Sequence, residues 1–229
     1  MEVFTDSYYE FSNVVQGSRK GSWKEVTNMA GVAKGKLRGY FSVSQFRRFQ
    51  DRDYTANFGA YFTMKDSYLH LETGFAWDRT FTYRLQDTIE YSRKLRKNLY
   101  WQLGYNFRAY PTGDTNLIYP GLIYYFGDSY ISANYAASVI QARGTGSMGS
   151  MKLNIAANKY VNWWFGGAYG QWLYDIVGLR PQDEMGYIIF SGFTFNITKW
   201  ASARIGYSYG TERPRFLKRN LMYGLAFKF

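Results

Sequence analysis

Apolar and polar residues alternate along most of the chain with a period of two. One face of the last segment is apolar and consists of Leu221, Tyr223, Leu225, Phe227 and Phe229. Small or polar residues occupy the other face. The same pattern recurs near residues 54–64, 99–108, 131–139 and 201–210. Successive side chains of a β-strand point to opposite faces of a sheet, so this period predicts an all-β protein.

The alternating segments are about 10 to 14 residues long, whereas strands of globular proteins average about five or six. A tilted strand needs roughly 9 to 11 residues to cross a bilayer. Fourteen strands are predicted, over residues 3–13, 22–33, 37–49, 53–64, 67–77, 83–94, 97–109, 114–126, 129–142, 149–160, 162–174, 186–197, 200–211 and 216–229. Because residues 22–33 alternate poorly and residues 78–85 could extend a strand, twelve strands is the alternative.

The connections between these segments alternate in length. Longer ones are predicted at residues 14–21, 50–52, 78–82, 110–113, 143–148, 175–185 and 212–215. Outer-membrane barrels have short periplasmic turns and longer outer loops. We therefore expect residues 1–229 to form a single domain, a transmembrane antiparallel up-and-down β-barrel of the bacterial outer membrane, with both termini on the periplasmic side.

A soluble barrel or sandwich, with the apolar face inside, is the main alternative. The polar face is rich in Gly, Ser, Asn, Thr, Arg and Tyr, which suits a wet lumen. Tyr and Trp gather near the predicted strand ends, where a lipid–water boundary would lie, among them Tyr40, Trp101, Tyr125, Trp163, Trp164 and Trp200. The terminal strand, with Gly224, Phe227 and Phe229, resembles the signal that such barrels present to their insertion machinery.

The composition agrees with this assignment. Aromatic residues make up 21% of the chain, yet the mean hydropathy is −0.39, because the two properties belong to opposite faces of the same strands. No window approaches the roughly 18 consecutive apolar residues of a spanning helix. The chain has no Cys, which excludes a disulfide scaffold and a Cys-based metal or redox site. A signal peptide is expected for such a protein, and since Met1-Glu2 leads directly into the first strand, we expect a mature form with an added start Met.

Several segments resemble the YaiO-type outer-membrane barrel family. They are residues 8–11 (YYEF), 43–54 (VSQFRRFQDRDY), 83–87 (YRLQD), 104–110 (GYNFRAY) and 227–229 (FKF). The resemblance implies an outer-membrane location and an association with exopolysaccharide or cell-surface glycan systems. Members fused to helical repeats exist, and such repeats are absent from this sequence. The family supplies no catalytic residues to carry over.

Enzymatic chemistry has one candidate centre, the single histidine, His70. A hydrolase of the Ser–His type needs a hydroxyl within hydrogen-bond reach of the base. Positions 68 and 72 are Tyr and Glu, and no clear nucleophile is evident. We expect His70 to belong to a lumenal hydrogen-bond network and the chain not to be an enzyme, with an outer-membrane hydrolase as the alternative.

Metal and cofactor sites are not expected. Asp51 and Asp53 are interpreted as loop carboxylates that pair with nearby arginines rather than bind calcium. The glycine pairs lack the strand-to-helix context of a phosphate loop, so they are expected to make room for bulky lumenal neighbours.

The basic residues behind the net charge of +11 divide by position among the lumen, the outer loops and the periplasmic turns. The lumenal titratable residues are expected to be Arg38, His70, Glu72, Arg84, Glu90, Arg108, Lys152 and Arg204. Basic residues of the outer loops are expected to be Arg47, Arg48, Arg52, Arg79, Arg180, Arg213 and Arg215. The Arg fork there suits lipopolysaccharide phosphates or acidic glycans. A lipid-embedded barrel has no reason to bind nucleic acid.

Two functions follow from this pattern. The first is a narrow pore or conduit for envelope glycan or anionic solutes, since a positive lining favours anions. The second is a plugged structural or docking barrel that binds a periplasmic protein of a glycan-assembly system.

Overall fold

The computed structural model of the protein describes residues 1–78, 80–111, 113–141, 144–171, 185–212 and 216–229, apart from the side chains of Gln16, Glu212 and Phe216. The chain forms strands β1 (Glu2–Gln16), β2 (Arg19–Lys34), β3 (Leu37–Arg48), β4 (Asp51–Thr63), β5 (Ser67–Trp77), β6 (Leu85–Arg96), β7 (Leu99–Tyr110), β8 (Gly113–Phe126), β9 (Ser129–Ile140), β10 (Gly144–Ala156), β11 (Val161–Gln171), β12 (Met185–Asn196), β13 (Ala201–Glu212) and β14 (Phe216–Lys228). The described residues contain no helix long and apolar enough to cross a membrane.

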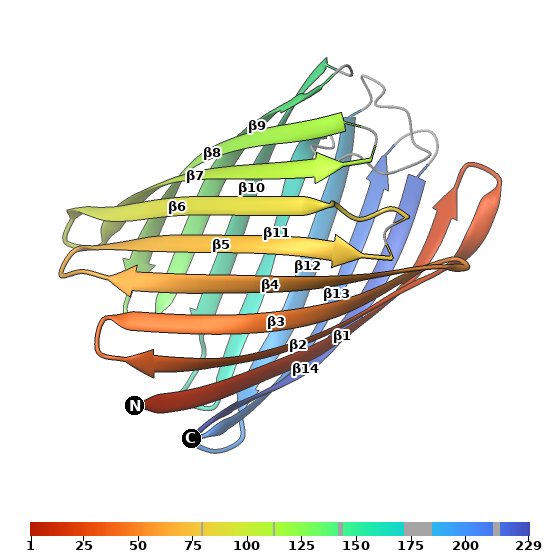
Figure 1. The fold of residues 1–229 in the computed structure, drawn as a ribbon. Helices are drawn as coiled ribbons and strands as arrows, with labels where there is room; N and C mark the ends of the chain where they lie inside the picture. The colour runs from red at the N-terminus through yellow and green to blue at the C-terminus, as the bar shows by residue number, and fades with distance from the viewer. Residues whose placement is uncertain (79, 112, 142–143, 172–184, 213–215) are drawn as a thin grey trace.

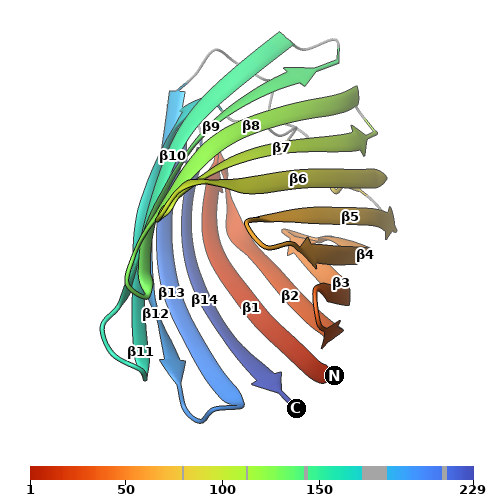
Figure 2. The ribbon, with the colours of Figure 1, turned by 90° about the vertical axis from the view of Figure 1, so that its left-hand side faces the viewer.

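The strands form one closed antiparallel barrel (Figures 1 and 2). Each strand pairs with its neighbours in sequence, and β1 pairs with β14 to close the circle, from Phe4 opposite Lys228 to Gln16 opposite Phe216. Closure satisfies the ladder hydrogen bonds of every strand, which an open sheet in lipid cannot do. The predicted all-β barrel of 14 strands is confirmed, and the twelve-strand alternative is wrong because β2 is a full strand.

The two ends of the barrel differ. One end, called the turn end here, holds both termini and the connections after the even-numbered strands; the opposite end is called the loop end (Figure 1). The predicted long connection at residues 14–21 is wrong, because only Gly17 and Ser18 separate β1 from β2. Gly17 has a φ of 60°, which suits a two-residue hairpin turn. The buried Val14 continues the lumenal face of β1 into that hairpin.

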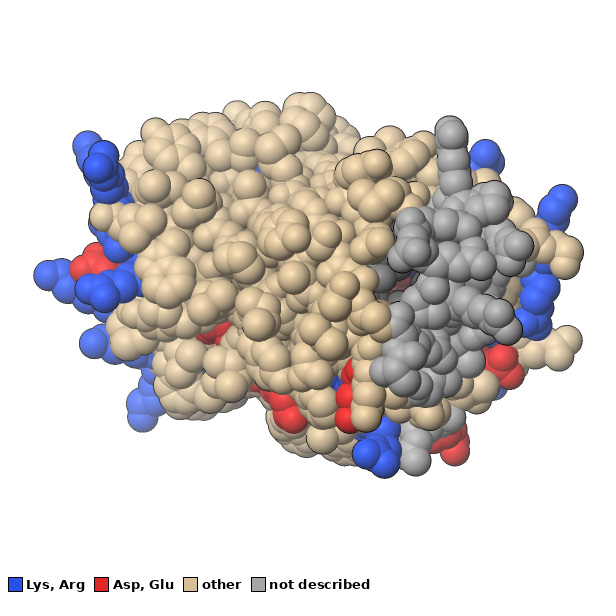
Figure 3. Space-filling model, turned by 90° about the horizontal axis from the view of Figure 1, so that it is seen from above, with Lys and Arg blue, Asp and Glu red and all other residues tan. Residues whose placement is uncertain are grey.

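The outer face of the barrel is apolar. Large outward side chains are about half exposed along its middle, among them Phe58, Ile89, Tyr135, Ile189 and Tyr223. Seen from above, most Lys and Arg lie at the two ends of the molecule, and most of the described surface between them is uncharged apart from a few acidic side chains (Figure 3). Such a band between two charged rims matches the outward face of a membrane barrel.

Glycines on the inner face make room for aromatic rings of adjacent strands. A Cβ on Gly59 would meet the Tyr40 ring at 2.1 Å, and one on Gly104 would meet the Tyr119 ring at 2.0 Å. These rings therefore lie flat on the barrel wall instead of standing into the lumen. Of the glycines singled out in the sequence, Gly166 makes room for the Phe190 ring, whereas a Cβ on Gly144 would meet nothing within 4 Å.

Candidate functional site

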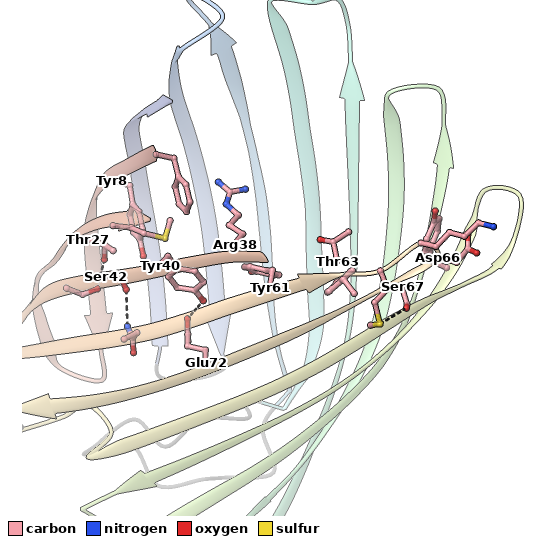
Figure 4. Close-up of a pocket in the computed structure, with 18 residues that line it drawn as sticks. Tyr8, Thr27, Arg38, Tyr40, Ser42, Tyr61, Thr63, Asp66, Ser67 and Glu72 are labelled. Atoms are coloured by element: carbon pink, nitrogen blue, oxygen red, sulfur yellow. Dashed lines mark hydrogen bonds between the residues drawn. The ribbon is translucent and has the colours of Figure 1, made fainter. Parts of the chain in front are cut away.

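A cavity of about 830 Å³ opens in the lumen toward the turn end, against β1 to β5 (Figure 4). It is called the turn-end cavity here. Five tyrosines line it, Tyr8, Tyr40, Tyr61, Tyr68 and Tyr100. Arg38 and the side chains of Thr27, Ser42, Ser44, Asn57 and Glu72 contribute to the same lining. Inner-face positions of successive strands converge here because closure brings the same phase of each strand to the lumen.

Tyr40 is the centre of a hydrogen-bond network in this cavity. Its hydroxyl donates to Glu72 Oε2 at 2.5 Å and lies 2.8 Å from His70 Nε2. The hydroxyl has one proton, so when it is given to Glu72, His70 Nε2–H must be the donor to Tyr40. Glu72 Oε1 also accepts from Gln86 Nε2 at 2.9 Å. In that arrangement the lone pair of a neutral His70 imidazole is on Nδ1 and not on Nε2, the nitrogen that contacts Tyr40.

His70 is fixed by stacking as well. Its ring lies 4.1 Å from the Tyr61 ring with an interplanar angle of 8°. The neighbouring carboxylate, Glu90, accepts from Tyr68 at 2.6 Å and from Gln102 at 2.8 Å. The structure thus places His70, Glu72 and Glu90 near one another on the lumenal wall, with Glu72 and Glu90 in separate hydrogen-bonded groups.

Residues 80–82, which lie between β5 and β6, pack against the loop end of this wall. Asp53 is fully buried, and its carboxylate accepts from the backbone amides of Thr80, Phe81 and Thr82 and from the Thr82 hydroxyl, at 2.6 to 2.8 Å. Asp53 lies in β4, so its interpretation as a loop carboxylate is wrong, and the donors to it are groups of residues 80–82 rather than an arginine. A carboxylate with four donors holds residues 80–82 inside the barrel.

Tyr83 follows this anchored segment and lies outside the strands. Its hydroxyl donates to Asn57 Oδ1 at 2.8 Å. Burial, the largest cause, raises the pKa of the Tyr83 phenol, and the phenol is therefore protonated and able to donate at neutral pH. Residues 80–83 are thus held against β4 by two sets of hydrogen bonds, those from residues 80–82 to Asp53 and that from Tyr83 to Asn57.

Arg48 differs from its expected place among the outer-loop residues. It ends β3 with its side chain inside the barrel, where the guanidinium lies 4.6 Å from the Trp23 ring centroid and 4.5 Å from that of Phe81. The alternation of β3 gives Arg48 the lumenal phase, and two aromatic faces hold it there. Arg47 and Arg52 are exposed at the loop end, whereas Arg79, Arg180, Arg213 and Arg215 lie outside the described residues.

The other expected lumenal cations have distinct surroundings. Arg38 stacks on Phe4 at 3.9 Å from the ring centroid. Arg108 Nη1 lies 3.4 Å from the Tyr110 hydroxyl, and Lys152 and Arg204 line a second lumenal cavity. Arg84 differs, because it precedes β6 and is exposed.

Sequence reasoning did not place three further residues, Asp6, Tyr40 and Trp164, on the inner face. Asp6 forms an ion pair with Arg204 inside the barrel, although its phase in β1 matches that of Glu10 and could have revealed it. Tyr40 and Trp164 line the lumenal cavities, where the expectation placed them at a lipid boundary. Among the described residues no cluster of three or more His, Cys, Asp or Glu side chains could hold a metal ion.

Comparison with known proteins shows the fold class. The chain is similar to a bacterial polysaccharide outer membrane secretin, with a TM-score of 0.67, 8% identity and 98% coverage of both chains. It is similar to the toluene transporter TbuX of Ralstonia pickettii, with a TM-score of 0.67 and 9% identity over 99% of this chain and 88% of the transporter. An anion-selective porin from Comamonas acidovorans has a TM-score of 0.53 and 10% identity over 99% and 98% of the two chains.

These TM-scores show a shared fold, that of outer-membrane barrels. No family model matches the chain, and no curated protein matches it. The resemblance to the YaiO family stays a prediction.

Proposed function

We propose that the chain is an outer-membrane barrel that forms a narrow conduit for sugar-like or anionic solutes, with the turn end in the periplasm. The observation that carries the proposal is the turn-end cavity inside a closed barrel, lined by tyrosines, hydroxyls and Arg38. Hydroxyl and amide groups suit a polyhydroxylated solute, and the tyrosine rings offer apolar faces to its C–H groups. A cavity of this size holds a small solute, and it does not resemble the wide opening of a large porin.

Arg38 is the residue we propose to select charge in this conduit. It lines both the turn-end cavity and a neighbouring cavity of about 210 Å³ at the turn end. No described carboxylate lies within ion-pair distance of its guanidinium, and the Phe4 ring supports one face of it. A planar fork in this position can take a carboxylate or phosphate in two hydrogen bonds.

Conductance in planar bilayers tests the conduit. The full chain is expected to give discrete channel events with a preference for anions, and Arg38→Gln is expected to lower that preference. Arg47→Gln is the matched control, because Arg47 lies on the same strand but is exposed at the loop end. Absence of channel events at every salt concentration would overturn the proposal.

A plugged docking barrel is the second candidate function. It is favoured by the anchored residues 80–82 and by Arg48 between Trp23 and Phe81, which fill the loop end of the β2–β5 wall. A plugged barrel gives no channel events in planar bilayers. Its turn end binds a periplasmic protein of a glycan-assembly system. Recovery of such a partner by the non-conducting protein would favour docking over conduction.

Lipid and assembly partners complete the proposal. The exposed Arg47 and Arg52 at the loop end are suited to lipopolysaccharide phosphates or an acidic glycan. Phe227 and Phe229 face outward on the last strand, and Gly224 in the same strand packs under Ser7 and Tyr8 of β1. We propose that the insertion machinery binds β14 before β14 pairs with β1.

The proposal includes no enzymatic step. His70 Nε2 is a donor to Tyr40 and its ring is stacked on Tyr61, an arrangement that serves packing and hydrogen bonding. The alternative, a hydrolase that uses His70, requires activity on ester substrates that is lost in His70→Ala. Esterase activity of the purified chain with that dependence would overturn the non-enzymatic assignment.

A further inference from the structure

A second cavity of about 500 Å³ lies in the lumen against β10 to β14 and is called the β10–β14 cavity here. Its apolar lining comes from Trp164, Ile188, Phe190 and Met222. Its polar lining includes Lys152, Asn154, Thr194, Arg204 and Asn220. Cavities with an apolar surface and a few placed polar groups are typical ligand sites.

Trp164 forms a flat platform in this cavity. It pairs in register with Gly192 of β12, which pairs in turn with Gly206 of β13. A Cβ on either glycine would meet the indole ring at 2.3 Å, so the ring lies across both strands against the wall. One face of the indole is covered by the two glycines, and the opposite face is turned to the cavity.

The polar groups next to this platform come from the adjacent strand. Asn154 of β10 is the register partner of Trp164, and Lys152 lies two residues before it on the same inner face. An amide and an ammonium group therefore line the same cavity as the indole from the strand on the other side of β11. Thr194 of β12 lies two residues beyond Gly192 on the inner face and adds a hydroxyl.

Lys152 is a positive charge without an ion pair to a described residue, in a cavity that Glu10 and Lys218 also line. Among the described residues, no carboxylate lies within ion-pair distance of it, and its Nζ lies 6.0 Å from the Tyr130 ring centroid. Arg204 in the same cavity is already paired with Asp6. The cavity thus combines a flat aromatic face, hydrogen-bonding groups, one carboxylate (Glu10), one paired arginine and two lysines, of which Lys152 is the one on the strand next to the platform's own strand.

We propose that the β10–β14 cavity is a binding subsite for a uronate, a sugar ring that carries a carboxylate. The C–H face of the ring stacks on Trp164, the carboxylate pairs with Lys152, and ring hydroxyls bond to Asn154 and Thr194. An apolar aromatic solute would leave Lys152 and Asn154 desolvated without partners, and a small inorganic anion would not use the indole. The inference rests on the proposed conduit for sugar-like or anionic solutes and names one class of them.

Isothermal titration calorimetry on the full chain in detergent tests the subsite with trigalacturonate as the probe. Its fully methyl-esterified form is the matched ligand, since it keeps the rings and lacks the charges. We expect trigalacturonate to bind at least tenfold more tightly than the ester. Lys152→Met is expected to remove most of that difference, and Trp164→Leu to weaken both ligands at least fivefold.

Trp163→Leu is the matched control variant, because Trp163 is the neighbouring tryptophan and faces outward, where its Nε1 donates to Ser191 Oγ. It is expected to bind like the wild type. Should Trp164→Leu fail to fold, Lys152→Met decides the question with both ligands. Equal affinity for acid and ester in the wild type, or no effect of Lys152→Met, would overturn the subsite.

Binding and conduction are separate measurements. A protein that conducts but does not bind trigalacturonate overturns the subsite and leaves the conduit. A protein that binds it without conducting supports the subsite and overturns the conduit.

Discussion

Asp53 Oδ2 accepts hydrogen bonds from both the backbone amide and the hydroxyl of Thr82, at 2.6 and 2.8 Å. The two residues are 29 positions apart, and both are buried. A carboxylate bonded to several backbone amides is held by charge-assisted hydrogen bonds, which are stronger than neutral ones. The pair therefore fixes the β5–β6 connection to the inner face of β4.

Replacing Asp53 with Asn is expected to release this connection. The new amide group presents a donor where residues 80–82 also present donors, and each buried donor left without an acceptor costs about 1 to 3 kcal/mol. We expect a loss of about 2 to 4 kcal/mol in the free energy of unfolding, measured by urea denaturation of the folded barrel in detergent. Asp51→Asn is the control, since Asp51 is exposed at the same end.

The same variant tests the closure of the loop end. If residues 80–82 narrow the lumen, Asp53→Asn should raise single-channel conductance, while Asp51→Asn should not. An unchanged conductance in a barrel shown to be destabilised would place the narrowest part of the lumen elsewhere.

Gly59→Ala is expected to displace Tyr40. The added Cβ would lie 2.1 Å from the Tyr40 ring, and the ring would have to leave Glu72 and His70. Overpacking of this kind costs about 1 to 3 kcal/mol. Thermal unfolding followed by circular dichroism gives the stability loss. Gly39→Ala is a matched substitution with its nearest atom at 4.0 Å, and equal losses in the two variants would contradict the packing argument.

The ion pair of Asp6 and Arg204 is expected to contribute about 1 kcal/mol, because its side chains are 20% and 30% exposed and are only partly screened by solvent. It links β1 to β13 across β14, at the closure of the barrel. A double-mutant cycle with Asp6→Asn and Arg204→Gln measures the coupling. A coupling energy near zero at low salt would show that the pair adds no stability.

Phe229→Ala is expected to slow assembly without much effect on the stability of the finished barrel. Phe229 is 74% exposed, so its removal costs little packing. Insertion into vesicles with and without the insertion machinery separates the two effects. A matched change at another exposed aromatic, Tyr160→Ala, should leave the assembly rate unchanged. Slower insertion in the absence of the machinery would instead assign the effect to intrinsic folding.

The strand pattern of the sequence was sufficient to predict the fold. Period-two alternation gives each inward residue its face, which is why His70, Glu72 and Lys152 lie on the lumenal wall where their phase puts them. Strand ends were harder, because alternation does not say where pairing stops. The β1–β2 hairpin shows this, since Val14 and Arg19 belong to strands that continue beyond their predicted limits.

The inner positions of Arg48 and Asp53 could not be predicted from the sequence, because they depend on contacts with residues of other strands and connections. Arg48 lies inside because Trp23 of β2 and Phe81 of a distant connection provide two ring faces for it. Asp53 is buried because the amides of residues 80–82 reach it. Both contacts depend on a register between segments that are far apart in sequence, and the alternation within one strand carries no information about that register.

The pairing of β1 with β14 makes the barrel a structure that cannot be completed while its chain is still being delivered. The first strand has its final partner only when the last 14 residues arrive, and until then both carry a row of unpaired backbone groups. Synthesis and closure are thus separated in time, and the growing polypeptide must be kept from aggregating in between. If one strand were removed, the remaining strands could not close the barrel by moving to a new register. The glycines and the rings that lie on them set one register for each strand pair.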